Sequence, residues 1–155
     1  VVVGSSMGGW IACLMAVARP ERIRAIVGIA PAVDFTQALL WPRLDADARR
    51  QIEEEGVWLR PSVYDDGPYP ITKTLIEDGK SHLLMPGPIP FKGPVRLIHG
   101  MQDDAVPWEH SLRIADAMES EDVEIALVKD GEHRLSRDAD LARLISAVAN
   151  VVNGD

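Results

Sequence analysis

An almost continuously apolar run at residues 23–30, interrupted only by Arg24, constrains the fold more than any other feature of the chain. A strand that is covered on both faces has this composition, and such strands belong to parallel sheets flanked by helices. Similar short apolar runs lie at residues 1–3, 94–99 and 123–128. We therefore expect four strands of one parallel sheet.

Helical segments separate these runs. Apolar residues recur at helical spacing from Met7 to Pro20, and Pro107 opens a second helix. Ser136 is the predicted N-cap of a last helix that Gly154 closes. The predicted buried face of that helix consists of Leu141, Leu144, Ile145, Val148 and Val152. Strands that alternate with helices predict an α/β fold with right-handed crossovers.

One interval does not fit a simple crossover. A crossover needs roughly a dozen residues, whereas residues 32–93 supply 62. Short helices are predicted within this interval at residues 45–55 and 71–84. We interpret residues 32–93 as an inserted cap, and residues 1–31 and 94–155 as the core of the fold.

Composition excludes several classes of function. The net charge of -8 gives no basic surface for a phosphate backbone, so no nucleic-acid partner is expected. No apolar stretch approaches the roughly 20 residues that cross a bilayer, so no transmembrane segment is expected. The single cysteine, Cys13, cannot form an internal disulfide, and no Cys/His cluster has the spacing of a zinc site.

Residues 4–8, Gly-Ser-Ser-Met-Gly, match the G-x-S-x-G pattern between a predicted strand and a predicted helix. This sharp turn strains the central serine, and small residues are required two positions before and after it. Ser6 has glycine at both positions, whereas Ser5 would have Val3 at the first. Ser6 is therefore the candidate nucleophile, and the Met7 N–H is a candidate donor to an oxyanion. The alternative is an ordinary or phosphate-binding Gly/Ser turn.

A serine nucleophile needs a base and a carboxylate that orients the base. In α/β-hydrolases these residues follow in the order Ser, Asp or Glu, His, in loops after later strands. Residues 100–104 and 130–133 form such loops, and they offer Asp103 and His133. Asp104 is the competing acid.

The neighbouring histidine is interpreted differently. His99 closes a buried strand just before Gly100, and we expect it to be structural.

Residues 4–10, 99–108 and 132–134 together resemble the α/β-hydrolase superfamily. Within it, they resemble the group of mycophenolic acid acyl-glucuronide esterases and mitochondrial palmitoyl-protein thioesterases, with its bacterial relatives. Residues 56–58 and 88–90 of the expected cap are also similar to this group. The resemblance covers most of the chain.

The resemblance assigns the nucleophile to Ser6, the acid to Asp103 and the base to His133. Hydrolases of this kind have about eight strands, with the serine turn after the fifth. The chain would then hold strands five to eight with the cap, without the earlier strands and their second oxyanion donor. Residues 1–3 would form an exposed apolar edge, which favours self-association.

The resemblance implies a serine hydrolase that cleaves carboxylic esters or thioesters through an acyl-enzyme, without a metal or organic cofactor. Fatty-acyl thioesters, including acylated proteins, are the favoured substrates. The expected contacts of the acyl group in the cap are Trp58, Leu83, Leu84 and Met85. The alternatives are a general carboxylesterase acting on small esters and a non-catalytic fragment or binding module. The expected location is the cytoplasm in a bacterium and the mitochondrion in a eukaryote.

Overall fold

The chain divides into two compact units. The computed structural model describes residues 1–61 and 67–154. The first unit contains Val1–Val33 and Leu84–Asp155, and the second contains Asp34–Leu83. Most of the interval 32–93 thus forms a unit of its own. Residues 84–93 belong to the first unit, because Ile89 is fully buried there and bridges to Met118.

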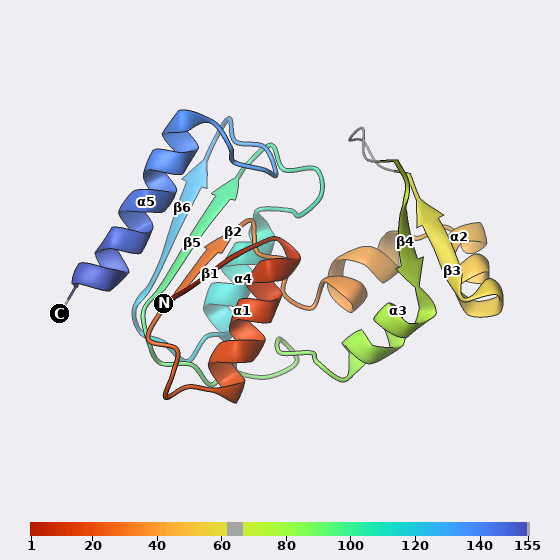
Figure 1. Cartoon of the computed structure of the whole chain (residues 1–155), viewed down its shortest axis with the longest axis horizontal. Coiled ribbons are helices and arrows are strands. Elements are labelled where there is room, and N and C mark those ends of the chain that lie inside the picture. Colours follow the sequence, from red (N-terminus) through yellow and green to blue (C-terminus); the bar gives the residue numbers. More distant parts are fainter. Residues whose placement is uncertain (62–66, 155) are drawn as a thin grey trace. The chain divides into compact units, whose positions relative to one another are not determined.

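The first unit is built on a parallel sheet with the strand order β1, β2, β5, β6. The strands are β1 (Val2–Ser5), β2 (Ile26–Ile29), β5 (Val95–Gly100) and β6 (Val123–Val128). Every residue of the two central strands, β2 and β5, is buried: β2 is apolar throughout, and the two polar side chains of β5, Arg96 and His99, are hydrogen-bonded. The predicted α/β fold with a parallel sheet is confirmed (Figure 1).

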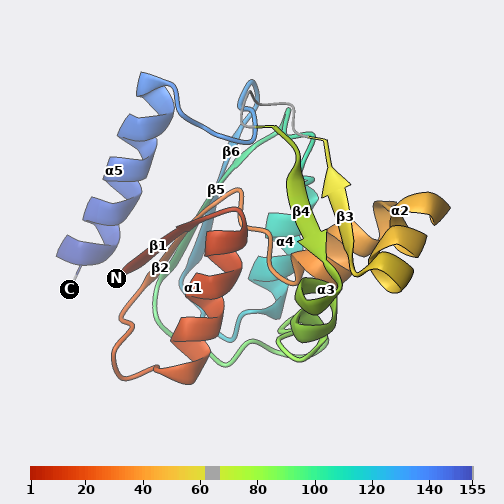
Figure 2. The same cartoon turned by 45° about the vertical axis from the view of Figure 1, so that its right-hand side comes forward.

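Helices cover both faces of this sheet. They are α1 (Met7–Ala18), α4 (Glu109–Ala117) and α5 (Asp138–Asn153). Helix α5 lies on one face, and α1 and α4 lie on the other (Figures 1 and 2). Among the described residues, no helix is both long and apolar enough to cross a membrane.

The predicted start and buried face of α5 were wrong in part. The N-cap is Arg137 rather than Ser136, and the Arg137 side chain binds Asp140 within the first turn. The residues that pack toward the sheet are Leu144, Ala147, Val148 and Val151. Three predicted core residues, Leu141, Ile145 and Val152, are 44%, 69% and 48% exposed. The apolar side of α5 is thus wider than the face that the sheet of this chain covers.

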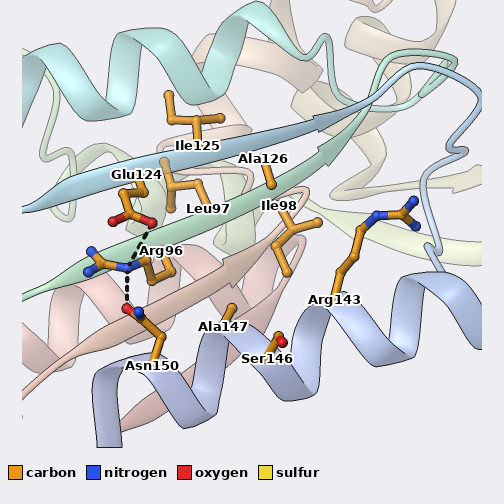
Figure 3. Close-up of a pocket in the computed structure, with 10 residues that line it drawn as sticks. All are labelled: Arg96, Leu97, Ile98, Glu124, Ile125, Ala126, Arg143, Ser146, Ala147 and Asn150. Carbon is orange, nitrogen blue, oxygen red and sulfur yellow. Dashed lines mark hydrogen bonds and ion pairs between the residues drawn. The ribbon is translucent and has the colours of Figure 1, made fainter. Parts of the chain in front are cut away.

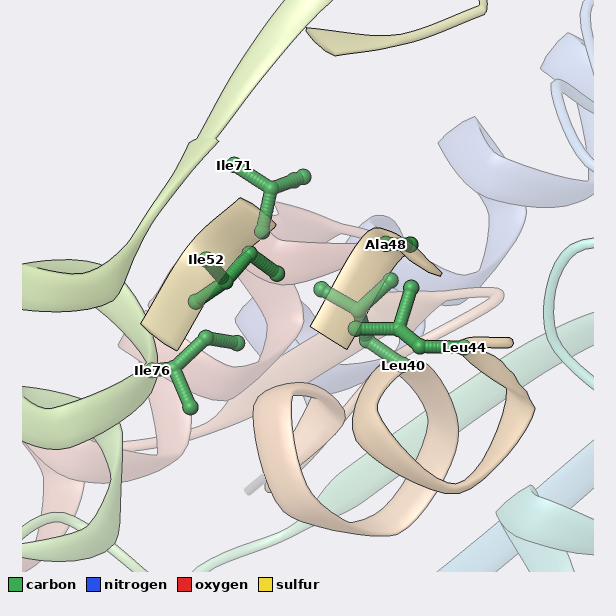
Figure 4. Close-up of a cluster of buried hydrophobic side chains, with 6 residues drawn as sticks. All are labelled: Leu40, Leu44, Ala48, Ile52, Ile71 and Ile76. Atoms are coloured by element: carbon green, nitrogen blue, oxygen red, sulfur yellow. The ribbon is translucent and has the colours of Figure 1, made fainter. Parts of the chain in front are cut away.

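The second unit combines short helical turns with a two-stranded antiparallel sheet. Its elements are η1 (Thr36–Leu40), η2 (Trp41–Arg43), α2 (Ala46–Arg50), η3 (Gln51–Glu55), β3 (Val57–Arg60), β4 (Tyr69–Thr72) and α3 (Lys73–Lys80). Its core consists of Leu40, Leu44, Ala48, Ile52, Ile71 and Ile76 (Figure 4). The unit therefore has a hydrophobic core of its own.

The structure tests the two helices that were predicted within residues 32–93, and it confirms only one of them in full. The prediction at residues 45–55 is confirmed: Asp45 caps α2, and the helical segment ends at Gly56, whose φ of 83° is left-handed. The prediction at residues 71–84 was wrong at both ends, because α3 spans only Lys73–Lys80. The chain enters β4 first, and the Thr72 side chain then caps α3 by accepting the Leu75 N–H at 3.1 Å.

Candidate active site

Ser6 occupies the sharp turn between β1 and α1. Its φ of 52° and ψ of -121° are strained for a residue with a side chain. Three backbone hydrogen bonds hold this conformation. The Ser6 N–H donates to the Ile29 carbonyl at 2.9 Å, and the Ser6 carbonyl accepts from Gly9 at 2.9 Å and Ala32 at 3.0 Å. The neighbouring strand and the loop after it thus fix the serine at the carboxyl end of the sheet.

The glycines around Ser6 have different functions. A Cβ at Gly4 would collide with the Gly8 carbonyl, so Gly4 must stay small. A Cβ at Gly8 itself would meet no atom within 4 Å, and the expectation that packing requires glycine there was wrong. Gly9 is the second constrained position, because its Cβ would lie 2.6 Å from the Pro31 Cβ. The Gly8 carbonyl lies against Gly4 of β1, whereas a side chain at position 8 would point into open space.

The structure brings Ser6, His133 and Asp103 into one hydrogen-bonded chain. His133 Nε2 lies 3.1 Å from Ser6 Oγ, and His133 Nδ1 lies 2.7 Å from Asp103 Oδ2. The carboxylate accepts the Nδ1–H, which leaves Nε2 free to accept the serine proton. Ser6 follows β1, Asp103 follows β5 and His133 follows β6. Parallel strands end at the same edge of a sheet, so the three side chains meet there.

The Asp103 carboxylate is enclosed and fully hydrogen-bonded. Its side chain is 0% exposed, and Oδ1 accepts the N–H groups of Ala105 and Val106 at 2.9 and 2.8 Å. Burial raises the pKa of Asp103, but hydrogen bonds from His133, His99 and Val106 outweigh burial and hold this pKa well below its ordinary value. Asp103 is therefore a carboxylate throughout the working range of pH. Asp104, the competing acid, is exposed to solvent.

Met7 is the first residue of α1, so its N–H has no acceptor within the helix. This N–H follows directly on Ser6, and the first turn of α1 contains no acidic residue that would oppose an anion. The geometry suits an oxyanion that forms beside Ser6.

The four expected contacts of an acyl group lie in different units. Trp58 packs against the core of the second unit. Leu83 belongs to the same unit, whereas Leu84 and Met85 belong to the first, and all three are partly buried. Their contact with an acyl group stays a prediction.

Sequence reasoning missed the neighbourhood of His99. The side chain of His99 is fully buried, and its Nε2 lies 3.3 Å from Asp103 Oδ2. The available signal was the spacing of four residues between His99 and Asp103 across the end of β5. A histidine at a strand end can reach back to a loop carboxylate at that spacing.

The first unit also holds a cavity of about 320 Å³ between β5, β6 and α5 (Figure 3). None of the three hydrogen-bonded side chains at the strand ends lines it. Its cations are already paired, Arg96 with Asp122 at 2.7 Å and Arg143 with Asp140 at 3.0 Å. Among the residues that the structure describes, no group of three or more His, Cys, Asp and Glu side chains could hold a metal ion.

A parallel α/β sheet with a strained serine turn, and with acid and histidine loops at the same edge, defines the class of protein: it is an α/β-hydrolase. The chain belongs to the prolyl oligopeptidase family, whose model matches residues 1–150.

Two mammalian proteins with the same name are similar to nearly the whole chain. Palmitoyl-protein thioesterase ABHD10, mitochondrial, from Bos taurus is 41% identical over an alignment of 156 residues that covers 99% of this chain and 50% of the bovine protein. The Homo sapiens protein of the same name is 38% identical over 154 residues, with the same coverage. The chain thus spans about half the length of the curated relatives it matches.

Solved structures agree with these matches. Mouse alpha/beta hydrolase domain-containing protein 10 has a TM-score of 0.86 at 40% identity. A protein from Agrobacterium vitis S4 has a TM-score of 0.90 at 38% identity. Each match covers 97% of this chain and 60% of the other. The resemblance to mitochondrial palmitoyl-protein thioesterases and bacterial relatives is confirmed.

Proposed function

We propose that this chain carries the catalytic residues of a serine hydrolase that cleaves acyl thioesters or esters. The observation that carries the proposal is the continuous hydrogen-bonded chain from Ser6 Oγ through His133 to Asp103 Oδ2, at 3.1 and 2.7 Å. A serine alone is a weak nucleophile, and this arrangement supplies both the base and the group that orients it.

The reaction proceeds in two halves. Ser6 Oγ attacks the acyl carbon while His133 Nε2 takes the serine proton, and the resulting oxyanion accepts the Met7 N–H. The bond to the leaving sulfur or oxygen then breaks, and His133 returns the proton to that atom. In the second half His133 removes a proton from water, whose oxygen attacks the acyl-enzyme. When the second oxyanion collapses, the bond between the acyl carbon and Ser6 Oγ breaks, and His133 returns the proton to Ser6 Oγ.

Asp103 acts throughout both halves. Its carboxylate holds the Nδ1–H of His133 and stabilises the imidazolium that forms after each proton transfer. Its lowered pKa supports this function, because only the ionised form accepts that hydrogen bond and opposes the new positive charge.

The substrate class rests on the similar proteins. The curated relatives are named palmitoyl-protein thioesterases, and we propose fatty-acyl thioesters, including acylated proteins, as substrates of this protein. Their names also place them in mitochondria. For this protein we propose that location in a eukaryotic source and the cytoplasm in a bacterial one.

The test compares substrates in the longest natural polypeptide that contains this chain. A palmitoyl thioester, a short activated ester and a prolyl peptide are assayed side by side, because the family match favours a peptidase as the second candidate. The proposal predicts that the thioester and the ester are cleaved faster than the peptide. Preference for the short ester over the thioester would indicate a general carboxylesterase, and preference for the peptide would overturn the proposal.

The nucleophile is tested with a fluorophosphonate probe. S6A should abolish labelling and turnover, and the matched control S5A should retain both, because Ser5 lies in β1 rather than at the strained turn. Labelling that survives in S6A but is lost in S5A would overturn the assignment.

A further inference from the structure

The buried His99 makes a second set of contacts behind the proposed nucleophile, base and acid. Its side chain is 0% exposed, and His99 lies one residue before the end of β5. Nδ1 lies 2.7 Å from Ser111 Oγ, and Nε2 lies 3.0 Å from the Val106 carbonyl and 3.3 Å from Asp103 Oδ2. Every polar atom of the ring is thus engaged.

We propose that His99 and Ser111 are positioning residues that hold the Asp103 carboxylate in register with His133. This inference rests on the proposed function, since it concerns the same reaction. It assigns His99 a function that its position at the end of a buried strand did not suggest.

The partners of His99 determine which nitrogen carries its proton. The Val106 carbonyl and the ionised Asp103 carboxylate can only accept, so Nε2 carries the proton and donates toward both. Ser111 Oγ–H can then donate to Nδ1. This hydrogen bond stabilises the tautomer that the two acceptors require, in which Nε2–H faces Asp103.

The contacts of Asp103 explain why this N–H matters. The N–H groups of Ala105 and Val106 hold Oδ1, but they belong to the same loop as Asp103 and would move with it. His99 instead lies in the sheet: its Nε2–H donates to the Val106 carbonyl at 3.0 Å and also lies 3.3 Å from Oδ2, the oxygen that accepts the His133 Nδ1–H. This contact connects Asp103 Oδ2 to strand β5, which is a rigid element.

Ser111 extends this connection to a helix. It lies in α4, is fully buried and reaches the ring across the end of the sheet. Strand β5 and helix α4 together therefore fix the carboxylate, and a catalytic group placed on rigid elements keeps its geometry better than one held by a loop alone.

The experiment uses four variants in the longest natural polypeptide, with kcat and KM measured separately on an acyl ester. H99F removes the donor and keeps a ring, H99Q keeps an N–H at a similar reach, and S111A removes the hydroxyl. S120A is the matched control, because Ser120 is also a nearly buried serine and its Oγ bonds to the Gly93 carbonyl at 2.7 Å.

We expect H99F to lower kcat about 10- to 100-fold, by analogy with the loss of an outer hydrogen-bond partner at metal sites, with KM little changed. S111A should lower kcat by a smaller factor, and H99Q should recover most of the loss in H99F. S120A should keep the wild-type kcat. The low-field proton resonance of the His133 Nδ1–H should shift in H99F and S111A and stay in place in S120A.

Other outcomes separate the two proposals. Wild-type kcat in H99F, together with an inactive S6A, would overturn the positioning function and leave the proposed hydrolase intact. If H99F does not fold, equal kcat in H99Q, S111A and the wild type overturns it instead. Equal losses in S111A and S120A would also overturn it, by showing a general effect of lost buried hydroxyls. Turnover that persists in S6A would overturn the proposed function itself.

Discussion

His133 Nδ1 lies 2.7 Å from Asp103 Oδ2, and the Asp103 side chain is completely shielded from solvent. A short hydrogen bond to a buried carboxylate fixes both the orientation of the imidazole ring and the nitrogen that carries its proton. Thirty residues separate the two side chains along the chain, and the parallel pairing of β5 and β6 brings them together.

Replacing Asp103 with Asn should therefore abolish most turnover. The amide cannot hold the Nδ1–H in the same way, so His133 adopts the wrong tautomer, and we expect kcat to fall by about 10⁴-fold. D104N is the matched control, and it should keep near wild-type kcat because Asp104 is exposed. Steady-state kinetics on an activated ester measures both, and equal losses would contradict the assignment of the acid.

Activity should fall as the pH is lowered, with a single acid limb. Asp103 does not cause this limb, because its hydrogen bonds hold its pKa well below the ordinary value and it stays ionised. Protonation of His133 does cause it, since an imidazolium cannot accept the Ser6 proton. A profile of kcat/KM against pH measures the limb. A limb near pH 4, where ordinary carboxyl groups titrate, would contradict this prediction.

The turn glycines give a matched pair of substitutions. G4A should destabilise the fold by about 2–3 kcal/mol or more, because the new methyl group collides with the Gly8 backbone, which cannot move aside cheaply. G8A should be tolerated, and it should stabilise α1 by about 0.5–1 kcal/mol, because alanine favours a helix more than glycine does and open space surrounds the site. Urea unfolding curves compare the two, and similar losses in both would contradict the geometry of the turn.

Asp140 should stabilise the chain in a pH-dependent way. A hydrogen bond from Arg137, aided by Arg143, lowers the pKa of Asp140 below 3.8. A group with a lowered pKa in the folded state contributes stability above its unfolded pKa and loses it as the pH falls through the folded value. D140N should therefore cost about 1 kcal/mol at pH 7, given its half-exposed arginine partners, and less below about pH 4. Thermal unfolding against pH measures this, with the exposed Asp138 as the D138N control.

Features that depend on a strand's own composition were predictable from the sequence. The central strands β2 and β5 are covered on both faces, so their positions could be recognised without a partner, and the order of the strand ends then located Ser6, Asp103 and His133.

Features that depend on contacts between elements were not predictable in the same way. The apolar side of α5 is wider than its buried face, so the sequence does not show which part meets the sheet. The need for glycine at position 9 comes from Pro31, which lies in another segment. The contact between His99 and Ser111 likewise joins β5 to α4, and no local pattern marks it.

The 155-residue polypeptide alone should self-associate. Strand β1 lies at one edge of the described four-stranded sheet, where Val1 and Val3 are 46% and 45% exposed. On the adjoining helix, Ile11 and Met15 are 49% and 46% exposed, so the free edge continues into an apolar surface. Such an edge favours pairing with another chain.

Light scattering after size-exclusion chromatography measures the oligomeric state of this polypeptide. V3K should raise the fraction of monomer, because a charged side chain on an edge strand opposes strand pairing. E21Q is the matched control, since it changes the net charge by the same one unit and Glu21 is exposed outside the strands and helices, and it should leave the association unchanged. A monomeric wild-type polypeptide would show that the exposed edge and the apolar side of α1 do not drive association. An equal response to both substitutions would trace the association to net charge instead.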